Sequence, residues 1–419
     1  MEFDELSQSG IRRVSDYSPY LDQLAGLANE MGLKQRSNLV HLERCLNAEW
    51  SLGQNSILSW TPTDEGILIL VVPHYAIAEY MAVSDRGDHV SKRVSARFIT
   101  ELISGDRQLT LTQMHKVARL LKVEPKSVVL RQALSTHPVE IHIVEKMIRR
   151  YGINYVASRA VTLFDIVGFS LLTPFEQMTQ LNSLSYSLNS AHAKMLELDV
   201  GINFARSSSG DGFYIWNRDH GLEANVNLYH FMHIVLADNA IASSKTASRA
   251  VPRLRACFHV GSCYEFHQAE GLNPTTHDFI VGDVTIELAR MIDAALPGQI
   301  LVGEFVAVIE DDALDETSSQ VNLDAVTFLR RAQGNLSKLG GLELSGDRVT
   351  AIKCYLTGER LESGEFSIRR LQIKDKHGLM RTAYNAKVNI YRDNAQPILL
   401  GIEDKKLAGA PSAPAKIVS

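Results

Sequence analysis

The chain has 419 residues, enough for about two or three domains, and its apolar (45%) and charged (22%) fractions are those of an ordinary globular protein. A net charge of −5 argues against a dominant nucleic-acid surface, and four scattered cysteines against a disulfide framework or a zinc site, so a reducing, cytoplasmic setting is expected. The acidic N-terminus is unlike a signal peptide. The apolar run 67–72 is far shorter than the roughly 20 residues that span a bilayer, so a membrane role would need a partner.

The first 90 residues contain no motif that indicates a chemical role. Hydrophobic patterning predicts a helix over residues 21–46 and a buried strand over 66–72 that stops at Pro73. The function of this N-terminal region stays open.

Residues 91–130 are basic, with eight Lys and Arg against three acids, and helices are predicted over 95–103 and 110–121. The stretches Phe98–Arg107 and Val123–Pro125 resemble the second half of repressor-type and antitoxin-type helix-turn-helix domains. That resemblance implies DNA binding through the basic helix. A solvated helical sensor or dimerisation module explains the same charges, and only half of the motif is present.

We expect this helical module to end at residue 136 and a connecting helix to follow over 137–152. The main domain, expected over 153–402, begins with a buried strand that ends at Asp165. A capping box then predicts a long amphipathic helix over 173–201.

Further along the chain, strands and helices alternate in a pattern typical of an α+β protein. A Gly-Asp-Gly turn at 210–212 joins two strand-like runs and indicates a hairpin with Asp211 at its tip. Helices are predicted over 222–242 and 284–295, strands over 253–260, 300–302, 349–355 and 381–390, an acidic insertion over 306–345, and a disordered tail over 403–419. The expected fold is an α+β sandwich, with a mixed sheet and surrounding helices, preceded by a mainly helical N-terminal domain.

Two aspartates at the ends of separate strands, Asp165 and Asp211, suggest a shared site. Carboxylates beside exposed backbone carbonyls are hard ligands suited to Mg²⁺ or Mn²⁺. Either aspartate alone would more often cap a helix or a turn. Together with Arg255, Arg290 and a lysine-bearing hairpin at 374–378, they favour a phosphoryl-transfer site. His230 and His233 are also spaced for a metal, but their apolar neighbours favour packing.

These motifs resemble the catalytic domain of class III nucleotidyl cyclases, clearly over 150–305 and more loosely over 349–392. The motifs are Phe164–Ser170, Gly210-Asp211, Arg255 with His259 and Gly261, Gly282-Asp283 with Arg290, and Pro297–Ile300. The resemblance implies that Asp165, Asp211 and the carbonyl of Ile166 bind two Mg²⁺ or Mn²⁺ ions. It further implies phosphate contacts from Arg255 and Lys376, stabilisation of the transition state by Arg290, and substrate contacts from Phe169, Asp278 and Phe279.

The resemblance also implies a homodimer with two shared sites, because the aspartates and the last arginine of each site come from different subunits. The implied reaction is attack of the ribose 3′-hydroxyl of a nucleoside triphosphate on its own α-phosphate, with release of pyrophosphate. A cyclase fold can persist without activity, so a DNA-binding regulator with a cyclase-like sensing domain is the competing interpretation.

The chain departs from this family at the positions that read a purine. Ser207 replaces a base-reading lysine, Phe279 replaces an Asp, Thr or Cys, and Ile286 replaces a ribose-binding Asn. Three alternatives stay open: ATP read by other groups such as Arg206 or Asp278, a site selective for no base, or a pyrimidine. The pyrimidine is slightly favoured, as in the anti-phage Pycsar cyclases that make cyclic CMP or cyclic UMP, with Phe279 filling the space beside the smaller base.

Overall fold

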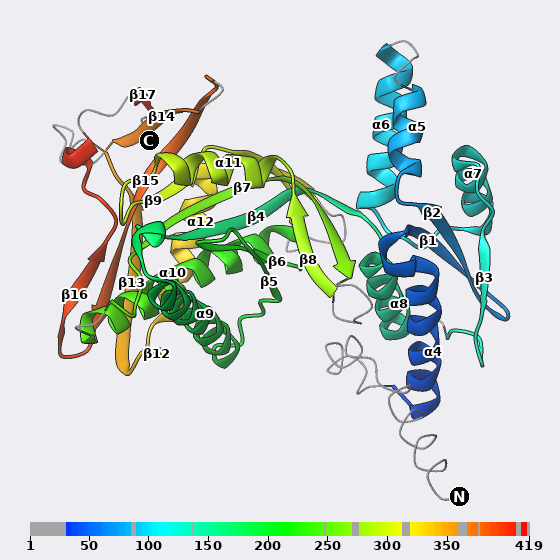
Figure 1. Cartoon of the computed structure of the whole chain (residues 1–419), viewed down its shortest axis with the longest axis horizontal. Helices are drawn as coiled ribbons and strands as arrows, with labels where there is room; N and C mark the ends of the chain where they lie inside the picture. The colour runs from blue at the N-terminus through cyan, green and yellow to red at the C-terminus, as the bar shows by residue number, and fades with distance from the viewer. Residues whose placement is uncertain are drawn as a thin grey trace, which may run out of the picture. The chain divides into compact units, whose positions relative to one another are not determined.

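The computed structural model describes residues 31–84, 89–135, 137–246, 249–269, 276–311, 319–358, 367–375, 378–407 and 412–416. The chain divides into two compact units, one of residues 1–155 and 264–279 and the other of residues 156–263 and 280–419 (Figure 1). None of the helices within the described ranges has the length and hydropathy that crossing a membrane requires.

The first unit is built on a small antiparallel sheet with the strand order β1-β2-β3. Its elements are α4 (Leu33–Trp50), η1 (Ser51–Gly53), β1 (Asn55–Thr63), β2 (Gly66–Pro73), α5 (Ala76–Ser84), α6 (His89–Ser104), α7 (Leu111–Leu121), β3 (Lys126–Val129) and α8 (Pro138–Arg150). The expected strand over 66–72 is confirmed, but the sheet around it was not anticipated.

Both faces of this sheet are buried by helices. Alternate residues of a strand point to opposite sides, so neighbouring residues of β2 belong to different cores. Ile67 and Ile69 of β2 pack with α4 and α8 in one core, whereas Leu70 and Val72 pack with α5, α6 and α7 in another. The unit is therefore a three-layer α/β/α arrangement and not a purely helical domain.

The expected module over 91–136 shares this architecture. Its two predicted helices correspond to α6 and α7, whose buried residues Ile99 and Met114 contact the sheet through Leu58 and Leu70. The expected connecting helix corresponds to α8, which contributes to the core shared with α4. Two helices packed on a β-sheet give no support to the DNA-binding interpretation.

The second unit is built on a mixed sheet, in which the described residues form twelve strands, in keeping with the expected α+β class. Its main path runs β12-β13-β15-β9-β7-β4-β6-β5, with β7 and β9 parallel and the β4–β6, β5–β6, β9–β15 and β13–β15 pairs antiparallel. The strands of the path are β4 (Asn154–Ile166), β5 (Phe204–Ser208), β6 (Gly212–Asn217), β7 (Leu254–Ala269), β9 (Ile300–Gly303), β12 (Glu343–Leu344), β13 (Asp347–Leu356) and β15 (Met380–Arg392). Off this path, the sheet also includes β8 (Thr276–Val281), β14 (Ile368–Lys374), β16 (Ala395–Leu400) and β17 (Ser412–Lys416). A separate antiparallel pair is formed by β10 (Val306–Asp311) and β11 (Ser319–Asp324).

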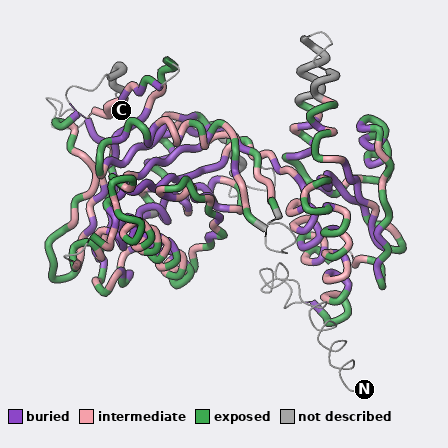
Figure 2. Tube along the Cα trace, viewed as in Figure 1, coloured by how far each residue is buried: buried purple, intermediate pink, exposed green. Residues whose placement is uncertain are grey.

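Helices cover both faces of this sheet (Figure 1). The helices α9 (Pro174–Glu197), α10 (Gly221–Lys245) and α12 (Ala325–Asn335) pack on one face, and α11 (Asp283–Ala294) packs on the other. The central strands are mostly buried, while the outer faces of α9 and α11 are exposed (Figure 2). The predicted helices over 173–201, 222–242 and 284–295 are thus confirmed.

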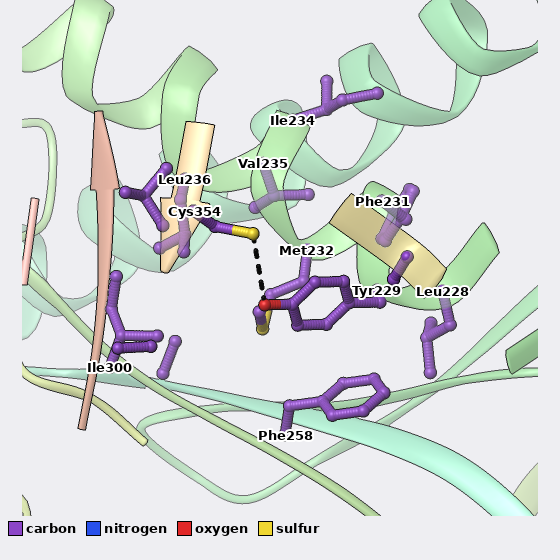
Figure 3. Packing of buried hydrophobic residues seen from close by; sticks show 14 of the residues in the cluster. Leu228, Tyr229, Phe231, Met232, Ile234, Val235, Leu236, Phe258, Ile300 and Cys354 are labelled. Atoms are coloured by element: carbon purple, nitrogen blue, oxygen red, sulfur yellow. Dashed lines mark hydrogen bonds between the residues drawn. The ribbon is translucent and has the colours of Figure 1, made fainter. Parts of the chain in front are cut away.

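Helix α10 is buried along most of its length and forms the middle of the larger core. Figure 3 shows Tyr229 in this core beside Phe258, with its hydroxyl donating to Sγ of Cys354 at 3.4 Å. Nε2 of His230 lies 2.9 Å from the carbonyl of Ala332, and His233 is fully buried. Both histidines therefore pack in the core, as predicted.

Two segments differ from expectation. The region 306–345, expected to be an acidic insertion with one helix, does contain α12, but Phe328 and Leu329 of that helix are core residues. In the tail expected to be disordered, η4 (Asp404–Leu407) forms and β17 pairs with β14. Buried apolar residues explain the first difference and strand pairing the second.

Candidate active site

Asp165 and Asp211 are brought together by the pairing of β4 with β6. Asp165 lies opposite Gly212 in the ladder, and the amide of Ile166 donates to the carbonyl of Asp211 at 3.0 Å. A Cβ on Gly212 would lie 1.9 Å from the carbonyl oxygen of Phe164, so only glycine permits this close approach. The Gly-Asp-Gly turn therefore places the Asp211 carboxylate beside Asp165.

The Asp165 side chain is almost fully buried, with 6% of its surface exposed. The pKa of its carboxyl is raised to about 6: burial raises it most, Arg255 lowers it, and the neighbouring Asp211 carboxylate raises it. A buried carboxylate with a second carboxylate beside it forms a site that favours a cation.

Arg255, on β7, supplies a cation to this point. Its Nε donates to Oδ2 of Asp165 at 2.7 Å, Nη2 pairs with the same oxygen, and Nη1 donates to the carbonyl of Ala295 at 3.2 Å. The sequence predicted that Arg255 holds the triphosphate, whereas here the guanidinium is bonded to the proposed metal ligand. The bond to Asp165 and a bond to phosphate would therefore compete for the same guanidinium.

The residues around Asp165 fit a magnesium or manganese site in which the protein supplies only some of the ligands. Within the described ranges, no three His, Cys, Asp or Glu side chains are grouped to hold a metal on their own. Two carboxylates and a strand-end carbonyl such as that of Ile166 are hard oxygen donors, and Mg²⁺ commonly takes only one or two carboxylates plus substrate phosphates. The donor set therefore matches cations that arrive with a triphosphate.

Arg290 lies in a second cluster of the same unit, in a pocket of about 260 Å³ on the α11 face. The lining consists of Ser207, Ser208, Tyr214, Ile280, Thr285, Ile286, Ala289 and Arg290. Nη1 of Arg290 is 3.7 Å from Oδ2 of Asp293, and among the described residues no ion pair joins Arg290 to Asp165 or Asp211. The pocket also brings together Ser207 and Ile286, two of the positions at which the chain departs from purine cyclases.

Phe279 and Asp278, which were predicted to contact the base, have partners of their own in β7. Phe279 stacks on Phe266, with ring centroids 5.7 Å apart and planes 19° from parallel, and Asp278 pairs with His267 at 2.5 Å. Successive residues of β8 point to opposite faces, and Ile280 forms the pocket wall instead. Phe279 does not line this pocket, and its contact with a base stays a prediction.

The other residues considered as substrate contacts are Phe169, Arg206 and Lys376. Phe169 packs against the larger core, and its carbonyl accepts from Nε2 of Gln177 at 3.1 Å. Arg206 donates to Oγ of Ser185 at 2.6 Å and lies over the ring of Phe213, so it points away from the pocket. Lys376 lies outside the described residues.

Sequence reasoning missed Tyr214 and Arg381. Tyr214 stands directly opposite Ser207 on β5 and Leu163 on β4, so strand alternation alone could have placed it on the pocket face. Arg381 pairs with Glu287 of α11 and, at 3.3 Å, with Asp375. Arg381 therefore ties the turn between β14 and β15 to the helix that carries Arg290, and no local motif announces that contact.

No family model matches this sequence, and no curated protein is similar to it in sequence. Solved structures show distant likeness. The guanylyl cyclase Cya2 is 13% identical with a TM-score of 0.32, over 56% of this chain and 92% of its own. The guanylate cyclase domain of RhGC from Catenaria anguillulae, in complex with GTP, is 14% identical with a TM-score of 0.33, over 55% and 97%. The adenylyl cyclase CyaB from P. aeruginosa is 14% identical with a TM-score of 0.27, over 41% and 93%. Likeness this distant identifies neither activity nor substrate.

Proposed function

We propose that this chain is a nucleotidyl cyclase that converts a nucleoside triphosphate to a 3′,5′-cyclic nucleotide and pyrophosphate. The observation that supports it is the convergence of Asp165 and Asp211 at one buried point beside Arg255. Such a site has acidic groups for cations and a guanidinium for phosphate, which are the groups that phosphoryl transfer uses.

In this proposal the carboxylates of Asp165 and Asp211, with the carbonyl of Ile166, hold two Mg²⁺ or Mn²⁺ ions. Such ions, when bound, would supply the positive charge that lowers the pKa of the ribose 3′-hydroxyl and offsets the charge of the triphosphate. Arg255 exchanges its bond with Asp165 for the triphosphate oxygens. Arg290 donates to the oxygens of the α-phosphate as negative charge develops on them. No side-chain base is required.

The proposed active form is a head-to-tail homodimer. In one chain the aspartate pair and the Arg290 pocket form separate clusters, and Arg290 is paired with its own Asp293. A two-fold dimer would bring the aspartates of one subunit to the Arg290 pocket of its partner and create two equivalent sites.

The proposed base is a pyrimidine. The pocket has a serine where a purine reader would have lysine, and within the described lining no carboxylate or carboxamide is available for bidentate contact with a purine. Anti-phage signalling, which the Pycsar resemblance implies, stays a prediction from the sequence. DNA binding is not proposed.

The test is to incubate the purified chain with each of the four nucleoside triphosphates and Mn²⁺ and to identify cyclic products by mass spectrometry. The proposal expects a 3′,5′-cyclic nucleotide that disappears in Asp165→Asn and Asp211→Asn. The isosteric asparagines preserve shape, so loss of product in a folded variant reports the charge. Absence of product from all four nucleotides at high enzyme concentration would refute the proposal.

A further inference from the structure

The peptide group that joins Ala295 to Leu296 is held by a side chain on each side. Its carbonyl oxygen, on Ala295, accepts from Nη1 of Arg255 at 3.2 Å. Its N–H, on Leu296, donates to Oε1 of Gln299 at 2.8 Å. This peptide bond is trans, so its N–H and C=O point in opposite directions. Gln299 therefore holds the group from the side opposite Arg255 and sets the direction of the carbonyl that Arg255 contacts.

The Gln299 side chain has only one way to make these contacts. The residue is 3% exposed, and its own backbone is fixed, because its amide donates to the carbonyl of Leu296 at 2.9 Å and its carbonyl accepts from the amide of Ala256 at 3.1 Å. A backbone N–H can only donate, so Oε1 must face Leu296 and Nε2 must point the other way. The buried amide of Gln299 therefore has a defined orientation.

Asn385 on β15 extends this chain of hydrogen bonds. Nε2 of Gln299 donates to Oδ1 of Asn385 at 3.0 Å, and Nδ2 of Asn385 donates to Oγ1 of Thr357 and to the carbonyl of Ile402, both at 2.8 Å. Asn385 is fully buried and Thr357 is 7% exposed. Buried hydrogen bonds that share their members strengthen one another. Two buried amides thus connect β15 to the carbonyl of Ala295.

We propose that Gln299 is a positioning residue for Arg255. In the proposed reaction, Nε and Nη2 of Arg255 exchange Asp165 for phosphate oxygens. The bond from Nη1 goes to a different group, the carbonyl of Ala295, and can persist during the exchange. It keeps the planar guanidinium oriented while its other two nitrogens change partners, and a two-pronged contact with phosphate requires that orientation.

This inference rests on the proposed function, from which it takes the contact of Arg255 with phosphate. Gln299 itself touches neither nucleotide nor metal and acts through the direction of one peptide group. Small displacements of a binding group weaken the contacts that it makes. Loss of the Gln299 amide should therefore reproduce part of the loss of Arg255, and it should add nothing in a chain from which Arg255 has already been removed.

The experiment measures the affinity for pyrophosphate in the presence of Mg²⁺, by isothermal titration calorimetry, in the wild type, Gln299→Met, Arg255→Gln and the double variant. Methionine is unbranched like glutamine but makes neither hydrogen bond. Gln299→Met should bind pyrophosphate about five- to tenfold more weakly than the wild type, whereas the same change in the Arg255→Gln chain should alter the affinity by less than about twofold. The KM for the nucleotide should rise with the first factor and kcat should fall less, because the phosphate contact is already made before the transition state.

Gln333→Met is the matched control, because Nε2 of Gln333 also donates to a carbonyl, that of Cys354 at 2.7 Å, and should leave the pyrophosphate affinity unchanged. The titration reports the number of sites separately from the affinity, so partial unfolding of a variant lowers only the number. If Gln299→Met does not fold, Asn385→Leu, which removes the partner of Nε2, gives the same comparison with an expected loss of about threefold.

An equal loss of pyrophosphate affinity with and without Arg255 overturns the inference, as does a wild-type affinity in Gln299→Met or a wild type that does not bind pyrophosphate. A loss that depends on Arg255 supports the inference even if no nucleotide is cyclised, so the inference and the proposed function can fail separately.

Discussion

Arg255 and Asp165 form an ion pair in which Nε and Nη2 of the arginine share one carboxylate oxygen. The pair neutralises a carboxylate that burial and Asp211 would otherwise hold partly protonated. The third nitrogen of Arg255 bonds the carbonyl of Ala295, which anchors the guanidinium next to the end of α11. A cation that binds Asp165 would therefore compete with Arg255 for the carboxylate, and a guanidinium released from it would be free for phosphate.

Removal of this competing cation should strengthen metal binding while it weakens catalysis. We expect Arg255→Gln to bind Mn²⁺ about three- to tenfold more tightly without nucleotide, because a positive charge near the carboxylates is lost. Turnover should fall by about 100-fold or more, because the triphosphate loses its guanidinium. Free Mn²⁺ measured by electron paramagnetic resonance gives the affinity. Arg253→Gln, whose guanidinium bonds the carbonyl of Pro297, is the control, and an unchanged Mn²⁺ affinity in Arg255→Gln would show that the pair does not compete with metal.

Gly212 is required for the approach of β6 to β4. In Gly212→Ala the new Cβ would meet the Phe164 carbonyl at 1.9 Å, so β6 must move away and carry Asp211 with it. We expect a loss of activity of about 100-fold or more, as small displacements of catalytic groups produce. Gly201→Ala, where a Cβ meets nothing within 4 Å, should leave activity unchanged. Full activity in Gly212→Ala would contradict the proposed aspartate pair.

Shared sites can be tested by mixing two inactive variants. Asp165→Ala lacks the acidic half of the site, and Arg290→Ala lacks the basic half. Random exchange of subunits should restore about a quarter of the wild-type activity, because about half of the dimers are mixed and each has one intact site. An equal mixture of Asp165→Ala and Asp211→Ala, which damage the same half, should stay inactive. Recovery in neither mixture would argue against a site shared between subunits.

The sequence allowed the aspartate pair and the long helices of the second unit to be predicted, because each has a local signal: a capping box, a Gly-Asp-Gly turn, or apolar residues at helical spacing. The pocket could not be predicted to the residue. A shift of one position on β8 exchanges Phe279 for Ile280, and only the pairing of β8 with β7 decides which of them faces the pocket.

The sheet of the first unit was missed for a related reason. Strand β1 is buried on both faces and includes Ser56, Ser59 and Pro62, so it shows no alternation of apolar and polar residues. The basic composition of residues 91–130 suggested an exposed charged surface. Arg107, one of the basic residues counted there, is instead fully buried. Charge in a sequence does not reveal whether a side chain reaches solvent.

Arg107 should be among the residues on which the first unit depends most. Its guanidinium donates to the carbonyls of Leu102, Ile103 and Ile153 at 2.8 Å and to Oδ1 of Asn154 at 2.9 Å, and burial lowers its pKa to about 9. Arg107→Met should reduce the free energy of unfolding of this unit by about 3 kcal/mol, because several buried carbonyls lose their donor. The unfolding of this unit can be followed by the fluorescence of Trp50 and Trp60 in a background that carries Trp216→Phe. Arg119→Met, on the exposed face of α7, should change the stability by less than about 0.5 kcal/mol, and equal effects of the two variants would contradict the structural role of Arg107.

His233 should make the second unit sensitive to acid. The pKa of this imidazole is lowered to about 4: burial lowers it most, the carbonyl of Tyr229, 2.7 Å from Nδ1, raises it, and the nearby His230 lowers it. The unfolded chain binds a proton at the ordinary pKa of about 6.5 and the folded chain only near 4. The stabilisation is therefore complete above pH 6.5 and is lost as the pH falls toward 4.

Between pH 7 and pH 5 this one group should reduce the free energy of unfolding by about 2 kcal/mol, since each pH unit corresponds to about 1.4 kcal/mol per proton. His233→Gln should be less stable than the wild type at pH 7 but should lose less stability on acidification. Denaturant midpoints at the two pH values give the comparison. The exposed His115→Gln is the control and should retain the wild-type dependence on pH. Because His259 is also buried with a pKa of about 4, His233→Gln should keep part of the slope, and an unaltered slope would mean that His233 is already protonated in the folded chain.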